Sequence, residues 1–93
     1  MTKSPNHKTV LRMRFAELHG ITETQLLRLL RTADYVYKYG VKYSNGGDDY
    51  LPAYEFAQSR FLANIKECGF DDYEMNGLYP TLRKNGQDIW LPE

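Results

Sequence analysis

Glycine stands directly before an apolar residue at four points in the chain, and this feature constrains the fold more than any other. The four pairs are Gly20-Ile21, Gly40-Val41, Gly69-Phe70 and Gly77-Leu78. Glycine adopts the left-handed conformation that ends a helix at little cost, and the apolar residue after it packs back on the last helical turn. The pattern therefore predicts four helix ends.

The spacing of apolar residues predicts two long helices. The first covers about 23–39, and Thr22 and Gln25 form a capping box at its start. The second covers about 52–68 and has its proline in the first turn, where proline is tolerated. Each helix has one apolar stripe at helical period. The stripes are Leu26, Leu29, Leu30, Ala33, Val36 and Tyr37 in the first helix, and Tyr54, Ala57, Phe61, Leu62, Ile65 and Cys68 in the second.

The segment before the first long helix fits two secondary structures. From Leu11 to Phe15 the residues alternate between apolar and polar, which is typical of a strand over 9–16. Leu11, Phe15 and Leu18 also share one helix face, and Gly20 is the first of the predicted helix ends. We favour a helix over 9–19 and keep the strand as the alternative.

Turn-forming residues define the rest of the chain. Asp71 is expected to cap a short helical turn that ends at Gly77, and residues 81–91 are expected to form a hairpin that turns at Asn85-Gly86. Residues 43–50 are expected to be a mobile loop and residues 1–7 to be disordered. The predicted fold is α+β and mainly α: three principal helices, a short helical turn and a C-terminal β-hairpin in one domain, 1–93.

The length and charge of the chain narrow its class. Ninety-three residues suit a single domain. The net charge is zero, yet residues 1–43 hold eight Lys and Arg against three Asp and Glu, whereas residues 44–93 hold four against nine. The two halves either neutralise each other within the fold or give the protein a basic side that attracts an anionic partner. With one cysteine and no long apolar run, we expect a cytoplasmic protein that does not bind membranes.

Residues 12–31 resemble a helix-turn-helix motif. The resemblance rests on a small residue in the first helix, a glycine in the turn and apolar residues after it, namely Ala16, Gly20, Ile21, Leu26 and Leu29. It implies that DNA would be contacted by Arg12, Arg14, Thr22, Thr24 and Arg28. The same pattern also fits any tightly packed pair of amphipathic helices.

A second candidate surface lies on the polar side of helix 23–39. Arg28, Arg31, Tyr35 and Lys38 follow one another at intervals of three, four and three, which places them on one face. Arginine and tyrosine are enriched at binding hot spots because they offer contact area and hydrogen bonds together. We expect this face to bind a partner; the alternative is an ordinary solvated helix face.

Catalytic and metal-binding patterns find no support in the sequence. His7, His19 and Cys68 have no recognised zinc spacing, and a calcium loop starting at Asp72 would have Arg83 where a bidentate glutamate is needed. We therefore expect no enzyme, no metal and no cofactor.

The expected function is that of a small regulatory or inhibitory protein that docks on a larger protein. The partner is sought first in nucleic-acid-processing machinery, since chains of this kind are common among phage and mobile-element proteins. The alternative is a helix-turn-helix DNA-binding transcriptional regulator. Assembly into a homo-oligomer is compatible with either function.

Overall fold

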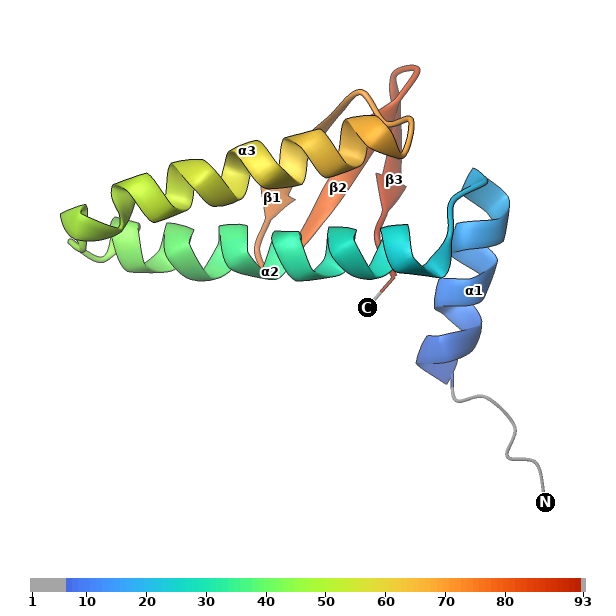
Figure 1. The fold of residues 1–93 in the computed structure, drawn as a ribbon, viewed down its shortest axis with the longest axis horizontal. Coiled ribbons are helices and arrows are strands. Elements are labelled where there is room, and N and C mark those ends of the chain that lie inside the picture. The colour runs from blue at the N-terminus through green and yellow to red at the C-terminus, as the bar shows by residue number, and fades with distance from the viewer. Residues whose placement is uncertain (1–6, 93) are drawn as a thin grey trace.

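A computed structural model describes residues 7–92 of the chain. Within this range the chain forms three α-helices, one 3-10 turn and a three-stranded antiparallel sheet, which confirms the α+β, mainly α class (Figure 1). The elements are α1 (His7–His19), α2 (Glu23–Ser44), η1 (Asp48–Tyr50), α3 (Leu51–Glu67), β1 (Asp72–Asn76), β2 (Tyr79–Lys84) and β3 (Gln87–Trp90). The disorder predicted for residues 1–7 lies outside the described residues, apart from His7, which begins α1.

Two of the four predicted helix ends are confirmed. Gly20 has a φ of 65°, and the N–H of Ile21 donates to the carbonyl oxygen of Ala16 at 3.0 Å. Gly69 has a φ of 90°, and the N–H of Phe70 donates to the carbonyl oxygen of Ile65 at 2.9 Å. These are the long backbone bonds with which a left-handed glycine closes a helix. The first of them establishes α1 as a helix and excludes the strand alternative for 9–16.

The helix end predicted at Gly40 is wrong, because α2 continues through it to Ser44. A Cβ atom at this position would lie 3.1 Å from the Tyr54 ring, so the glycine allows α3 to approach closely. Tyr54 also stacks against Tyr43 in the last turn of α2, with ring centroids 5.9 Å apart. Packing on α3 therefore extends the helix. Of the loop predicted over 43–50, residues 43–44 belong to α2 and residues 48–50 form η1, which leaves residues 45–47 outside a helix.

The short helical turn predicted to end at Gly77 is also wrong, since these residues form strand β1. Along Asp72–Asn76, exposed polar residues alternate with half-buried Tyr73 and Met75, which is the period of a strand. Gly77 has a φ of 82° and lies in the turn that joins β1 to β2. A left-handed glycine serves equally well in a hairpin turn, so its presence alone did not specify a helix.

The C-terminal hairpin is confirmed at the predicted turn. Lys84 pairs with Gln87, and Asn85 and Gly86 between them have φ values of 52° and 77°. Positive φ at both central residues is the conformation that joins two strands without opposing their twist.

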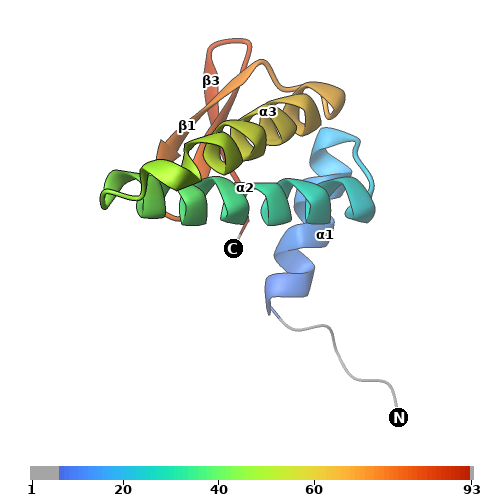
Figure 2. The ribbon, with the colours of Figure 1, turned by 60° about the vertical axis from the view of Figure 1, so that its left-hand side comes forward.

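The helices and the sheet form two layers. Helices α2 and α3 lie side by side in opposite directions and cover one face of the sheet, while α1 crosses near the start of α2 (Figures 1 and 2). The core lies between the layers; its most buried side chains include Leu26, Leu29, Val36, Phe61, Ile65 and Leu82. The opposite face of the α2/α3 layer is left without a covering element among the residues described (Figure 1).

Candidate functional site

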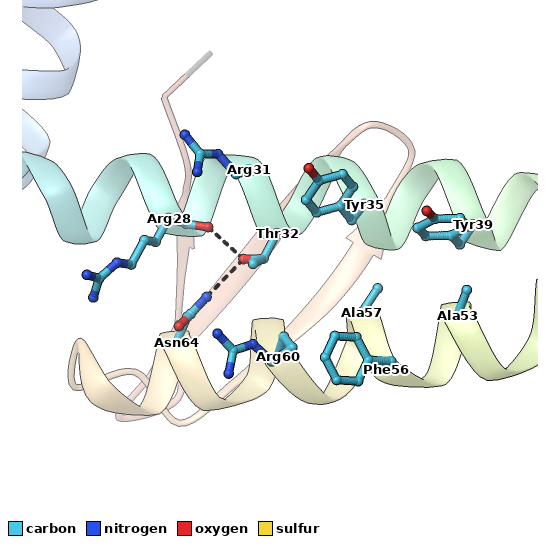
Figure 3. Close-up of a pocket in the computed structure, with 10 residues that line it drawn as sticks. All are labelled: Arg28, Arg31, Thr32, Tyr35, Tyr39, Ala53, Phe56, Ala57, Arg60 and Asn64. Carbon is cyan, nitrogen blue, oxygen red and sulfur yellow. Dashed lines mark hydrogen bonds between the residues drawn. The ribbon is translucent and has the colours of Figure 1, made fainter.

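A groove of about 520 Å³ runs between α2 and α3 on the side of the helical layer that faces away from the sheet (Figure 3). We call it the α2/α3 groove. Helix α2 contributes Arg28, Arg31, Thr32, Tyr35 and Tyr39, and α3 contributes Ala53, Phe56, Ala57, Arg60 and Asn64. The spacing of three or four residues along each helix brings these side chains to one face.

Small residues on α3 give the groove its depth. Ala57 is buried and Ala53 half-buried, and both point into the groove between larger side chains (Figure 3). A larger residue at either position would fill the space between the helices. The groove therefore follows from alanine in α3 lying opposite aromatic and basic residues in α2.

One polar bridge joins the two helices within the groove. The Thr32 hydroxyl donates to the carbonyl oxygen of Arg28 at 2.7 Å, and Asn64 Nδ2 donates to Thr32 Oγ1 at 3.3 Å (Figure 3). The Thr32 hydroxyl is thus used both as donor and as acceptor. We assign this pair a structural role, which is to fix the spacing of α2 and α3.

Three arginines give the groove its charge. Arg28, Arg31 and Arg60 are exposed, and within residues 7–92 none of them forms an ion pair. None of the ten residues that line the groove is acidic. Because no carboxylate lines the groove or pairs with the three guanidinium groups in the described part of the chain, the groove is suited to an anionic group of another molecule.

Aromatic side chains line the rest of the groove. Phe56 is 67 % exposed and Tyr35 is 43 % exposed. Tyr35 stacks on Tyr39 with centroids 6.4 Å apart, and Tyr39 lies 6.2 Å from Tyr50 of η1. A phenylalanine with two thirds of its surface in water is an unfavourable exposure in a small domain and a typical anchor at an interface.

The predicted partner-binding face is found in the groove except for one residue. Arg28, Arg31 and Tyr35 line it, whereas Lys38 does not and instead forms an ion pair with Asp34 at 3.2 Å. The α3 side of the groove, above all Phe56 and Arg60, is not among the residues predicted from the sequence. The sequence does contain one indication of this side: Phe56 lies outside the apolar stripe predicted for the helix over 52–68.

The structure places the predicted DNA-contacting residues on α1, at the start of α2 and in the α2/α3 groove. Arg12 lies between α1 and α2, where its Nε atom is buried and has no hydrogen-bond partner in the described part of the chain. The Thr22 hydroxyl accepts from the N–H of Gln25 at 3.1 Å as the helix cap, and Arg28 faces α3 across the groove. Arg14 and Thr24 are exposed.

The residues considered as catalytic or metal-binding candidates lie away from the groove or in the core. His19 packs against Phe15 and Phe70, with ring centroids 4.4 and 5.4 Å apart, and burial together with nearby Lys84 lowers the pKa of its imidazole. Between residues 7 and 92, no cluster of three or more His, Cys, Asp or Glu side chains could hold a metal ion.

The buried position of Cys68 leads to a test of its reactivity. Burial and then the nearby Glu67 carboxylate raise the pKa of the Cys68 thiol, which is 8 % exposed. The thiolate is the reactive form, so we expect reaction with Ellman's reagent at pH 7 to be much slower in the folded protein than in guanidinium chloride. Equal rates in the two conditions would place this side chain at an accessible site.

Comparisons with protein-family models, with curated proteins and with solved structures found no match to this chain. No helix in the described range has the length and apolar character needed to cross a membrane. The α2/α3 groove is therefore the feature from which we infer a function.

Proposed function

We propose that this protein is a small, non-enzymatic regulatory or inhibitory protein that docks on a larger protein through the α2/α3 groove. The observation that carries the proposal is the lining of the groove: three arginines without an ion pair within residues 7–92, beside exposed aromatic residues. Protein interfaces concentrate binding energy in such residues, because aromatic rings bury a large area and guanidinium groups donate several hydrogen bonds. Components of nucleic-acid-processing machinery are the partners we propose to examine first.

The second candidate function is that of a helix-turn-helix DNA-binding regulator. Its support is the α1–α2 turn, where buried Ala16 and left-handed Gly20 occupy the positions that the motif requires. It needs Arg12, Arg14 and Arg28 to reach one DNA duplex together. The burial of the Arg12 Nε atom and the position of Arg28 in the α2/α3 groove favour the docking function.

Photo-cross-linking tests the proposed function. A benzophenone amino acid in place of Phe56 should cross-link a protein in a lysate of the source cells after nuclease treatment. The adduct should still form when the salt concentration is raised before irradiation. The same group in place of Gln87, an exposed residue of the sheet, is the matched control and should give no such adduct. An adduct lost with nuclease and at moderate salt would favour the DNA-binding function, since phosphate contacts weaken steeply with salt.

A further inference from the structure

The α2/α3 groove has two chemically different ends. Arg28, Arg31 and Arg60 lie toward one end, and Tyr35, Tyr39 and Phe56 lie toward the other (Figure 3). The change from arginine to aromatic residues occurs at the same level along both helices. One turn separates Arg31 from Tyr35 on α2, and one turn of the antiparallel helix α3 separates Arg60 from Phe56. A ligand that fills the groove therefore meets cations at one end and aromatic rings at the other.

The groove has the length of a short peptide segment. Arg28 and Tyr39 are eleven positions apart on α2, which corresponds to about 16 Å along the helix axis. An extended peptide of about five residues covers this distance. The two alanines of α3 leave space for side chains of such a segment between the helices.

We infer that the groove binds an acidic–apolar segment of the partner protein, with its carboxylates against the three arginines and its large apolar side chains against Tyr35 and Phe56. This inference rests on the proposed function and specifies the partner chemistry. Charge complementarity carries it: carboxylates are the protein groups that pair with guanidinium in two parallel hydrogen bonds. The aromatic end supplies contact area but no cation among the residues that line it.

A single-stranded nucleic acid fits the groove less well. Its backbone carries charge at every nucleotide, so a strand along the groove would place phosphates at the aromatic end as well. Lys42 lies beside that end, with its Nζ atom 4.9 Å from the centroid of the Tyr50 ring and 5.9 Å from that of Tyr39. It does not line the groove. The charge of the groove matches a ligand that is acidic over only part of its length.

A peptide titration followed by NMR tests this assignment on the full chain. The probes are peptides of about ten residues, long enough to span the groove. Two have Asp and Glu in one half and Leu and Phe in the other, in either order, and a third has the same composition interleaved. An oligothymidine of similar length is the nucleic-acid probe. We expect one of the two block peptides to shift the amide signals of groove residues and to bind about tenfold or more tightly than the interleaved peptide.

Matched variants connect the binding to the groove. Arg31→Gln and Arg60→Gln should each weaken binding of the block peptide about tenfold or more, the effect of removing a charged hydrogen-bond partner. Lys38→Gln, on the same helix but outside the groove, should leave the affinity unchanged.

Four results would overturn the assignment. The first is that neither block peptide perturbs the groove. The second is that the interleaved peptide binds as tightly as the block peptides, and the third is that oligothymidine binds in the groove as tightly as the peptides. The fourth is that the unliganded chain self-associates and Arg60→Gln abolishes this association, which would identify a second copy of the chain as the occupant of the groove. A protein adduct from position 56 would still support the proposed function in the first two cases, so failure of the two proposals is distinguishable.

Discussion

Replacing Phe61 with alanine is expected to lower the free energy of unfolding by about 3–5 kcal/mol. The side chain is 0 % exposed and lies in the core that the helices form with the sheet. Its ring meets Tyr73 of β1 edge-on at a centroid distance of 4.6 Å. The substitution removes apolar contacts with both layers and leaves a cavity that the surrounding backbone cannot fully close.

Phe56→Ala is the matched control for this prediction. It makes the same chemical change on the same helix, but at a side chain that is 67 % exposed. We expect this control to shift stability by no more than about 0.5 kcal/mol. Thermal and urea unfolding followed by circular dichroism would measure both variants. Equal losses in the two proteins would contradict the assignment of Phe61 to the core and Phe56 to the surface.

Much of the fold could be predicted because its signals are local. The capping box of Thr22 and Gln25 forms with both of its hydrogen bonds, at 2.9 and 3.1 Å, and fixes the start of α2. The turn at Asn85-Gly86 likewise specifies its hairpin within four residues. In each case the residues that decide the conformation are neighbours in sequence.

The two errors occurred where the glycine–apolar pair does not by itself decide the conformation. Gly40 and Gly77 have the same glycine–apolar pattern as the two confirmed helix ends. Gly40 lies within α2 where Tyr54, fourteen residues away, packs against it, and Gly77 joins two strands because β1 pairs with β2. The same two-residue pattern occurs at helix ends, inside a helix and in a hairpin turn, so strand pairing and helix packing decide between them.

The candidate site was predicted in part for the same reason. Helical spacing was enough to place Arg28, Arg31 and Tyr35 on one face of α2. The pairing of that face with Phe56 and Arg60 depends on how α3 is rotated as it packs beside α2. Lys38 shows the limit of the spacing argument, since it continues the predicted face but lies outside the groove.

Arg31→Glu combined with Tyr35→Ala is expected to abolish binding of the partner found by cross-linking. Both side chains line the α2/α3 groove and both are exposed. Reversing the charge places a carboxylate where the proposed acidic segment would carry its own, and like charges facing each other in an interface cost several kcal/mol. Removing the Tyr35 ring takes away contact area at the other end of the groove. Neither substitution touches the core, so the melting temperature should remain close to that of the unchanged protein.

Lys38→Glu is the control that separates the groove from the wider helix face. It makes a charge reversal one turn from Tyr35 and replaces an exposed i,i+4 ion pair with Asp34 by a like-charge pair, effects of only about 0.2–0.5 kcal/mol each. Isothermal titration with the purified partner should show full affinity for this control and none for the double variant, with both folded by circular dichroism. Full binding by the double variant would exclude the groove. Equal loss of binding in the control would instead place the contact surface on the solvent-facing side of α2, away from α3.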